Sequence, residues 1–329
     1  MSSVMEPTGT PAGWEAYGDE RSERVGFFTD TSVCIGCKAC EVACKEWNLI
    51  PEDGLVWSGE SYDHTSQLDA NSWRHVAFVE QRKPLRIDGD RAAADALVEE
   101  TEEPLAQPDS GGLRADSLRW LMSSDVCKHC THAACLDVCP TGSLFRTEFG
   151  TVVVQEDICN GCGYCVPACP FGVLDQRKIP STLNVGHKPD LPAMGQHERG
   201  ESKDGRVWKC TLCYDRLKGG HEPACAKACP TKSIQFGPLD ELRARADERL
   251  AKVGEEGWNG AQLYGRNPDD GVGGFGAFFL LLDDPEVYGL PPDPVVTTRD
   301  LPDMWQNMIG AATAMVAGIA AIALLGGRR

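Results

Sequence analysis

The cysteines of this 329-residue chain constrain its fold more than any other feature, because all sixteen stand in four blocks of four. The blocks are Cys34-x2-Cys37-x2-Cys40-x3-Cys44, Cys127-x2-Cys130-x4-Cys135-x3-Cys139, Cys159-x2-Cys162-x2-Cys165-x3-Cys169 and Cys210-x2-Cys213-x11-Cys225-x3-Cys229. The first and third have the spacing of bacterial ferredoxins, in which three thiolates bind one [4Fe–4S] cluster and the fourth binds its neighbour. The second and fourth are the same run with a longer middle gap. The sequence therefore predicts four [4Fe–4S] clusters, with iron held through all sixteen cysteines, and a role in carrying electrons.

Structural zinc and disulfide bonds are the alternative uses of so many cysteines. Zinc favours two C-x2-4-C pairs per site, whereas three of these four blocks are runs that end in Cys-Pro. A disulfide framework suits a short secreted chain, but this one is long and shows no apolar N-terminal signal segment. Iron–sulfur clusters remain the prediction.

The residues between the cysteines suit this chemistry. Small residues allow backbone N–H groups to approach the sulfurs, where such hydrogen bonds help to set the cluster potential. These small residues are Gly36, Ala39, Gly161 and Gly163. Lysines next to ligands are expected to raise the potentials, unless they are ordinary surface lysines. They are Lys38, Lys45, Lys128, Lys209 and Lys227.

The four blocks can pair in a nested or in a sequential way. Blocks two and three are only 20 positions apart, from Cys139 to Cys159, which suits one compact two-cluster unit and leaves blocks one and four to pair around it. Sequential pairing would place 83 positions, Cys44 to Cys127, inside one unit. With the fourth ligand crossed, nesting predicts cluster A (Cys34, Cys37, Cys40, Cys229), cluster B (Cys210, Cys213, Cys225, Cys44), cluster C (Cys127, Cys130, Cys135, Cys169) and cluster D (Cys159, Cys162, Cys165, Cys139).

Charge and periodicity predict the remaining organisation. A net charge of −17 argues against a nucleic-acid partner. The predicted class is α+β, with two nested dicluster ferredoxin-like units, insertions and one C-terminal transmembrane helix. The predicted parts are an N-terminal arm (1–24), an outer unit from blocks one and four (25–86 and 206–237), an acidic insertion (87–117), an inner unit from blocks two and three (118–205), a connector with a helix and a strand (238–303) and the transmembrane helix (304–329).

Several local patterns predict individual elements. Alternating or apolar runs predict strands, and a 3.6-residue period closed by Gly254 predicts a helix over 239–253. The expected strands are 25–28, 72–79, 143–146, 172–174, 233–236 and 276–282. Helical turns are expected after Cys37, Cys165 and Ala224. The pattern of cluster loop, helical turn and strand recurs, which indicates an internal repeat.

The C-terminal segment predicts a membrane anchor. Residues 308–327 are 20 residues without a charge, about 30 Å of helix, which is enough to cross a bilayer core. Trp305 precedes this segment and Arg328-Arg329 follow it. The positive end favours a cytoplasmic C-terminus and places the cluster domain on the extracytoplasmic face of the cell membrane. A buried soluble helix is the alternative.

Several segments together resemble one protein family. The chain resembles the iron–sulfur (beta) subunit of membrane-bound respiratory formate dehydrogenase. The resemblance is carried by the four blocks, the C-terminal helix and the segments Ser72–Phe78, Trp208–Cys213, Glu222–Cys225 and Asp270–Gly274. The resemblance implies a molybdopterin catalytic alpha subunit, with molybdenum or tungsten, as electron donor. It also implies a cytochrome b gamma subunit that reduces quinone as acceptor. The ligand pattern of the family agrees with the nested pairing.

Other roles compete with this interpretation. The same relay could serve another molybdopterin enzyme, such as a sulfoxide, polysulfide or thiosulfate reductase, or the chain could be a stand-alone polyferredoxin. No nucleophile–base pair, HExxH pattern, Walker loop or GxGxxG stands out in the sequence, so no catalytic residue is predicted. The chain is thus expected to be an electron-transfer subunit rather than an enzyme in its own right.

Overall fold

The structure is a computed structural model, and it describes most of the cluster-bearing chain and one C-terminal helix. The described residues are 14, 17–18, 22–51, 57–60, 62–81, 119–177, 205–298 and 301–326, with side chains of the last helix described for 304–320 and 322. The predicted acidic insertion at 87–117 and most of the predicted arm at 1–24 lie outside these residues.

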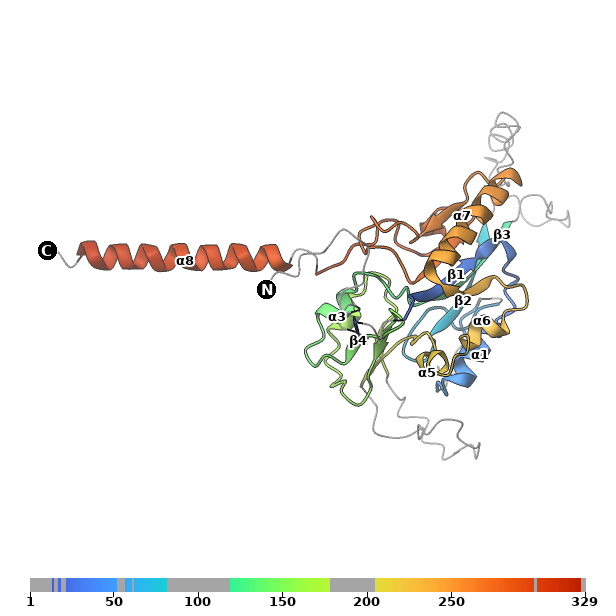
Figure 1. Cartoon of the computed structure of the whole chain (residues 1–329), viewed down its shortest axis with the longest axis horizontal. Helices are drawn as coiled ribbons and strands as arrows, with labels where there is room; N and C mark the ends of the chain where they lie inside the picture. Colours follow the sequence, from blue (N-terminus) through green and yellow to red (C-terminus); the bar gives the residue numbers. More distant parts are fainter. Residues whose placement is uncertain are drawn as a thin grey trace.

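A four-stranded sheet brings the first and last parts of the chain together (Figure 1). Its order is β8-β1-β10-β9, with β1–β10 parallel and the other pairs antiparallel. The strands are β1 (Val25–Asp30), β8 (Ile234–Pro238), β9 (Gln262–Tyr264) and β10 (Ala277–Leu281). All five residues of β10 are buried, because both faces of the sheet are covered. The predicted strands at 25–28, 233–236 and 276–282 are confirmed.

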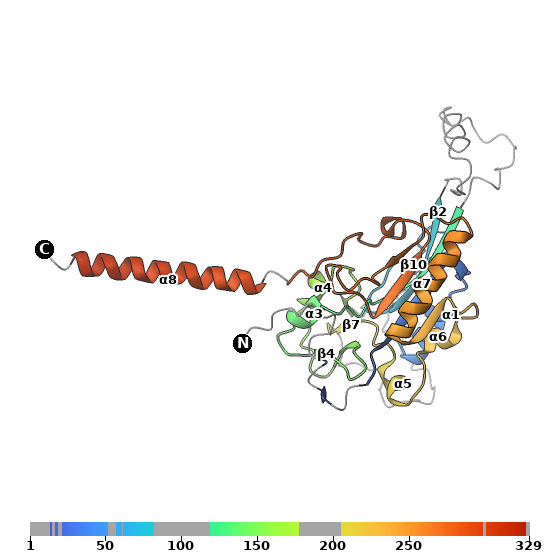
Figure 2. The same cartoon turned by 45° about the horizontal axis from the view of Figure 1, so that its top comes forward.

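One face of this sheet is covered by α7 (Leu239–Glu255), which packs against β1 and β8 (Figures 1 and 2). Its buried residues recur on one side of the helix, as the period predicts: Leu239, Leu242, Ala246 and Val253. The predicted end at Gly254 is wrong. The helix runs to Glu255, and Gly257 takes the left-handed conformation (φ 95°). Trp258 N–H donates to the Val253 carbonyl (3.1 Å) and Gly257 N–H to that of Gly254 (3.0 Å), which closes the helix as a Schellman motif.

Short helices gather in two groups on opposite sides of the body (Figures 1 and 2). The group from blocks one and four contains α1 (Ala39–Trp47), α5 (Tyr214–Lys218) and α6 (Ala224–Ala228), and α1 packs against α6. The group from blocks two and three contains α3 (Ala134–Asp137) and α4 (Cys165–Ala168), which pack against each other. Helical turns after Cys37, Cys165 and Ala224 are therefore confirmed.

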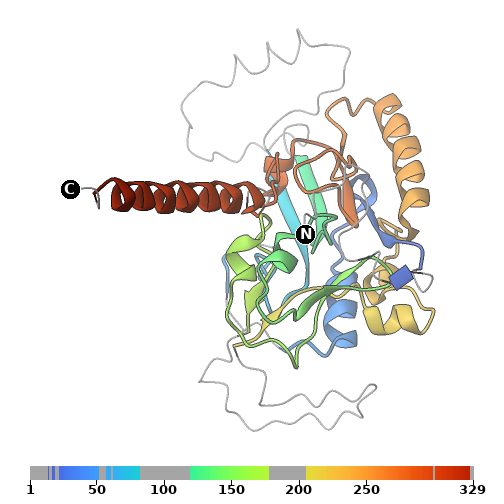
Figure 3. The same ribbon diagram turned by 60° about the vertical axis from the view of Figure 1, so that its left-hand side comes forward.

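Three two-stranded ribbons complete the frame. They are β2 (Arg74–Gln81) with β3 (Arg119–Val126), β4 (Leu144–Arg146) with β5 (Val152–Val154), and β6 (Asp175–Gln176) with β7 (Val207–Trp208). Figure 3 shows β2 and β3 as the cyan and green strands in the middle of the molecule. Two 3-10 helices, Thr31–Val33 and Pro285–Tyr288, lie in the connections. The strands expected at 72–79 and 143–146 are confirmed with shifted starts, whereas β3 was not predicted.

The strand expected at 172–174 is wrong, because that stretch belongs to a turn. Gly172 has φ 62° and donates its N–H to the Cys169 carbonyl (3.3 Å), so the strand begins only at Asp175. Gly142 and Lys232 occupy the same place after Cys139 and Cys229, with φ 68° and 57°. Their N–H groups reach the cysteine carbonyls at 3.4 and 3.3 Å. Every Cys-Pro block therefore ends in the same left-handed turn, a structural form of the internal repeat.

The chain ends in α8 (Leu301–Gly326), which projects away from the body in all three views (Figures 1 to 3). The connection before α8 is hydrogen-bonded to the group of blocks two and three. Thr297 Oγ1 donates to the Ala168 carbonyl (3.0 Å) and Thr298 Oγ1 to Asp137 Oδ2 (2.5 Å). Within the described residues, no helix is both long and apolar enough to span a membrane.

Candidate iron–sulfur sites

The first loops of the four cysteine blocks share one backbone feature. The second residue after the first cysteine is left-handed in all four: Gly36 (φ 63°), His129 (φ 45°), Gly161 (φ 72°) and Leu212 (φ 55°). This conformation costs a non-glycine residue about 1–2 kcal/mol, so two blocks adopt it against the local preference. The turn brings backbone N–H groups to the sulfur, as in the bond from Leu212 N–H to Cys210 Sγ (3.3 Å). The close N–H approach predicted from the small residues is thus present in the first loop of block four, Cys210–Cys213, which contains no glycine.

Blocks one and four approach each other around two places. At the first, the Cys34 thiol lies near those of Cys37 and Cys229. A hollow of about 300 Å³, including its open mouth, is lined there by all four cysteines predicted for cluster A. At the second, the Cys44 thiol lies near those of Cys210, Cys213 and Cys225.

Asn48 ties the second of these places together. Its Nδ2 lies 3.6 Å from Cys44 Sγ and 4.0 Å from Cys213 Sγ, so one amide contacts a thiol from each block. Asn48 also donates to the Cys44 carbonyl (2.8 Å) at the C-terminal end of α1. The fourth cysteine of block one thus lies among the first three of block four.

Blocks two and three approach each other in the same crossed way. The Cys130 thiol lies near those of Cys127, Cys135 and Cys169. The Cys165 thiol lies near those of Cys139, Cys159 and Cys162. These two groups of thiols contain the residues predicted for clusters C and D. In each set, three cysteines come from one block and the fourth comes from the other block.

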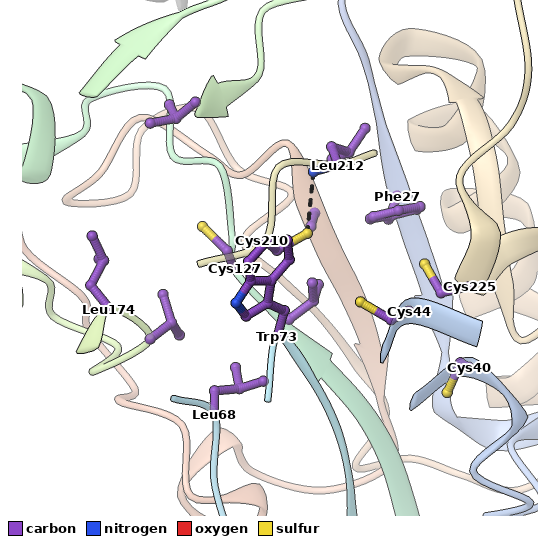
Figure 4. Packing of buried hydrophobic residues seen from close by; sticks show 14 of the residues in the cluster. Phe27, Cys40, Cys44, Leu68, Trp73, Cys127, Leu174, Cys210, Leu212 and Cys225 are labelled. Atoms are coloured by element: carbon purple, nitrogen blue, oxygen red, sulfur yellow. Dashed lines mark hydrogen bonds between the residues drawn. The ribbon is translucent and has the colours of Figure 1, made fainter. Parts of the chain in front are cut away.

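The four groups of thiols, at the sites predicted for clusters A to D, form a row. Cys40 lies near Cys225, Cys210 near Cys127, and Cys135 near Cys165. Figure 4 shows Cys127 beside Cys210, with Cys44 and Cys225 beyond them. These pairs join the predicted sites in the order A, B, C, D. Both ends of the row reach the surface, because Cys37 and Cys162 are exposed while all four cysteines of site B are buried.

Buried cations accompany this row. Lys128 and Lys209 are 0% and 1% exposed, so the surface interpretation of these two lysines is wrong. Lys209 Nζ donates to the carbonyls of Cys210 (2.9 Å) and Val152. Lys128 Nζ donates to Asp125 and to the Val126 carbonyl (3.0 Å), and lies 4.9 Å from the centre of the Phe279 ring.

The other lysines beside ligands lie nearer the solvent. Lys227 is exposed, and Lys38 Nζ pairs with Asp63 (2.8 Å) at the edge of site A. Only part of the predicted cationic environment is therefore built into the core. Lys209 lies near Cys210 of site B and Cys135 of site C, and Lys128 lies near Cys169 of site C.

Burial makes most of these thiols hard to ionise in the absence of a metal. It raises the pKa of Cys40 to about 11 and that of Cys135 to about 12. Cys139 shifts in the opposite direction. Burial alone would raise its pKa, but N–H groups of Leu144, Thr141 and Ser143 donate to its sulfur and lower the pKa below the ordinary value. Because bound iron replaces the thiol proton, cluster binding and folding are coupled at such sites.

The residues present fit the predicted cofactor. All sixteen cysteines are described, and each is a free thiol. They gather in fours around separate places, with N–H donors aimed at sulfur and unpaired buried donor atoms on Arg74 close by. Among the described residues, no three His, Cys, Asp or Glu side chains are placed to hold one single metal ion. In a four-iron cluster each iron takes its own thiolate.

Comparison with known protein families assigns this cofactor. A model of the 4Fe-4S dicluster domain matches residues 118–184, a second 4Fe-4S dicluster model matches 158–234, and a model of the 4Fe-4S binding domain matches 31–47. The predicted [4Fe–4S] chemistry is therefore confirmed, and the sixteen cysteines fit four clusters.

Comparison with curated proteins identifies the family. The formate dehydrogenase iron–sulfur subunit of Haemophilus influenzae is 36% identical over 298 residues, covering 89% of this chain and 76% of the relative. The iron–sulfur subunit of the nitrate-inducible formate dehydrogenase of Escherichia coli is 36% identical over 278 residues, covering 83% and 74%. This protein belongs to the family of formate dehydrogenase iron–sulfur subunits.

A further relative is more distant. One subunit of the anaerobic dimethyl sulfoxide reductase of Escherichia coli is 31% identical over 227 residues, covering 69% of this chain and 79% of the relative. The formate dehydrogenase iron–sulfur subunits thus align over more of this chain and at higher identity. Membership of their family confirms the predicted resemblance and the prediction of an electron-transfer subunit.

Sequence reasoning missed three polar residues of these sites: Asn48, Arg74 and Ser124. Arg74 carried a signal, because it stands among apolar and aromatic residues in an alternating strand pattern. His129, in the first loop of block two, is buried and accepts a hydrogen bond from Val152 N–H at Nδ1 (3.1 Å). Burial lowers its pKa well below the ordinary value, so the imidazole is neutral.

Proposed function

We propose that this chain relays electrons from a formate-oxidising molybdopterin catalytic subunit to a membrane cytochrome b subunit and quinone. The observation that carries the proposal is the row of four thiol gatherings with an exposed cysteine at each end. A [4Fe–4S] cluster supplies one-electron oxidation and reduction when bound. The protein itself holds the ligands in order, buries all four cysteines of site B and places fixed positive charge beside the row.

The ligand sets proposed are the nested sets defined above for clusters A to D. They are supported by the position of Cys44 among Cys210, Cys213 and Cys225, and by that of Cys229 near Cys34. The domain division proposed is the nested one as well. It is supported by the packing of α1 on α6 and of α3 on α4, each joining the two blocks of one unit.

We infer the direction of electron flow along the row from the C-terminal connection. Thr297 and Thr298 donate hydrogen bonds to residues of α4 and α3. The segment that leads to α8 therefore lies beside sites C and D. Site D is therefore assigned to the membrane partner and site A to the catalytic partner. Ile35 and Val42, which are 58% and 61% exposed beside site A, offer apolar surface for that contact.

The membrane anchor is also a proposal. It rests on the uncharged stretch 308–327, flanked by Trp305 and by Arg328-Arg329. Trp305, Met308 and Ile309 are more than half exposed, so the helix has apolar side chains with no cover from its own chain. In this arrangement the body lies on the extracytoplasmic face of the cell membrane.

Cofactor content gives a first prediction. Four clusters require 4 × 4 = 16 irons and equal acid-labile sulfide per chain, because four sets of four cysteines are available. Anaerobic purification followed by iron, sulfide and zinc analysis measures this. Stoichiometric zinc, or iron near half that amount, contradicts the proposed cluster content.

The donor gives a second prediction. Formate is expected to reduce the clusters of the intact complex, followed by paramagnetic resonance, and to support quinone reduction. The isolated chain is expected to oxidise no formate. A complex whose clusters respond to a different donor and not to formate would assign the same relay to another molybdopterin enzyme. A sulfoxide reductase is the specific alternative, because one relative is a subunit of a dimethyl sulfoxide reductase.

A further inference from the structure

Arg74 is a buried cation between sites A and B. Arg74 is 2% exposed. It is the first residue of β2 and pairs with Val126, the residue before Cys127. Nη1 donates to the carbonyl of Ser124 (3.3 Å) and to its hydroxyl oxygen (3.0 Å). That hydroxyl lies 3.2 Å from Cys40 Sγ. One short hydrogen-bonded path therefore connects the guanidinium to a cysteine of site A.

The other donors of Arg74 have no partner in the protein. Nε and Nη2 are both buried without a hydrogen bond, and no carboxylate of the described residues forms an ion pair with the guanidinium. A buried charge is costly unless it is paired and hydrogen-bonded. The Phe27 ring, 4.9 Å from Cζ, contributes a cation–π contact but accepts no ion pair. The missing partner must be an anion that the polypeptide does not supply as a carboxylate.

The neighbours that could supply that negative charge are thiols from sites A and B. They are Cys40 of site A and Cys44, Cys210 and Cys225 of site B. An arginine guanidinium does not lose its proton in proteins. The guanidinium is therefore a permanent positive charge facing two ligand sets.

The other buried cations differ from Arg74 in their partners. Lys128 and Lys209 use their ammonium groups on backbone carbonyls and on Asp125, and Arg146 donates to three backbone carbonyls. Arg24 lacks a partner at Nε alone. Within the described part of the chain, Arg74 is the one cation with two unpaired donor atoms.

We propose that Arg74 is a bridging residue, which donates its free N–H groups to sulfur of clusters A and B and holds the reduction potentials of both clusters up together. This inference rests on the proposed ligand sets. Reduction adds negative charge to a cluster, so a fixed positive charge and N–H donors favour the reduced form. Because one guanidinium serves both sides, its loss is expected to affect two neighbouring sites at once and to leave sites C and D unaltered.

The test is potentiometric titration of the intact complex, followed by paramagnetic resonance, for wild type, Arg74→Gln and Arg119→Gln. Arg119 is the matched control, because it lies on β3 of the same ribbon and contacts Leu282 O (2.9 Å) and Asp283 (3.2 Å) rather than a cysteine. We expect lower potentials for clusters A and B in Arg74→Gln, unchanged potentials for C and D, and no shift in Arg119→Gln. Unshifted A and B potentials, or an equal shift of all four, overturn the inference.

Two milder variants keep the test decisive if Arg74→Gln fails to assemble. Arg74→Lys retains the charge but loses the planar arrangement of donors, so the potentials of both clusters should lie measurably below wild type. Where Arg74→Gln does assemble, the decrease in Arg74→Lys should be the smaller of the two. Ser124→Ala removes the contact with Cys40 and should lower the potential of cluster A more than that of B. Labelling arginine with ¹⁵N should give a nitrogen coupling to the reduced clusters that Arg74→Lys removes. Wild-type potentials in both variants, or a persisting coupling, contradict the bridge.

The result can be separated from the proposed function. Sixteen irons per chain and reduction by formate, with unchanged potentials in the Arg74 variants, would remove the bridge and leave the relay intact. A wild-type complex without that iron content, or without reduction by formate, would instead remove the proposed function itself.

Discussion

Replacing Cys229 by serine is expected to damage the cluster held by Cys34, Cys37 and Cys40, almost 200 residues away in the sequence. The physical reason is proximity, since the Cys34 thiol lies near Cys229 and both line one hollow. Loss of one thiolate is expected to convert the cluster to a three-iron form or to change its potential. Paramagnetic resonance of the reduced and oxidised complex measures both, and the cluster held mainly by block four should keep its wild-type signal.

Cys44→Ser is the matched control, because it should do the reverse. The Cys44 thiol lies among Cys210, Cys213 and Cys225, so its loss should alter the cluster of block four and spare that of block one. Sequential pairing gives a different outcome, in which Cys44→Ser disturbs the cluster held by block two. A block-two response with block four untouched would refute the nested ligand sets.

Removing residues 305–329 is expected to release a soluble chain that keeps its clusters and no longer couples to the membrane acceptor. All sixteen cysteines lie before this segment, so cluster binding does not depend on it. Membrane flotation and iron analysis of the chain expressed without partners measure the two effects. A truncated chain that still floats with membranes would show that another surface binds them, contrary to the anchor proposal.

A charge placed in the middle of the stretch makes this test sharper. Arginine at a helix centre opposes insertion by about 2.5–3.5 kcal/mol, which corresponds to roughly a hundredfold loss in partition. Gly318→Arg should therefore weaken flotation strongly. Gln306→Arg, at the border of the uncharged stretch, is the control and should change it little. Equal flotation of the two variants would argue that the helix does not lie across the bilayer.

The elements that the sequence predicted well depend on local patterns. The apolar run at Phe27-Phe28 and that at Phe278-Phe279 are buried strands, and the period of α7 is visible in its leucines. The end of α7 was misplaced because two glycines, Gly254 and Gly257, stand three residues apart. Only the backbone shows that Gly257 takes the left-handed position.

The features that the sequence did not predict depend on distant neighbours. The strand β3 contains Ser123 and Ser124, which are buried yet polar, so its alternation is hidden. Ser124 is accommodated because Arg74 donates to it from β2. The role of Arg74 in turn depends on thiols from blocks one and four. No local pattern carries that information. The nested pairing of the blocks, which the spacing of the cysteines predicts, stays a proposal.

The position of β1 between β8 and β10 determines the order in which parts of the chain can fold during translation. Strand β1 can pair with β8 and β10 only after residues 234–238 and 277–281 have been synthesised. The ribosome must therefore add over 200 residues after β1 before this sheet can form. At about 5–20 residues per second, the thiols of block one wait on the order of ten seconds or longer for those of block four. The cysteines of blocks two and three meet much sooner. We therefore expect a nascent chain to complete its middle first and to leave Cys34–Cys44 open to oxidants or to an iron–sulfur carrier until translation is nearly finished.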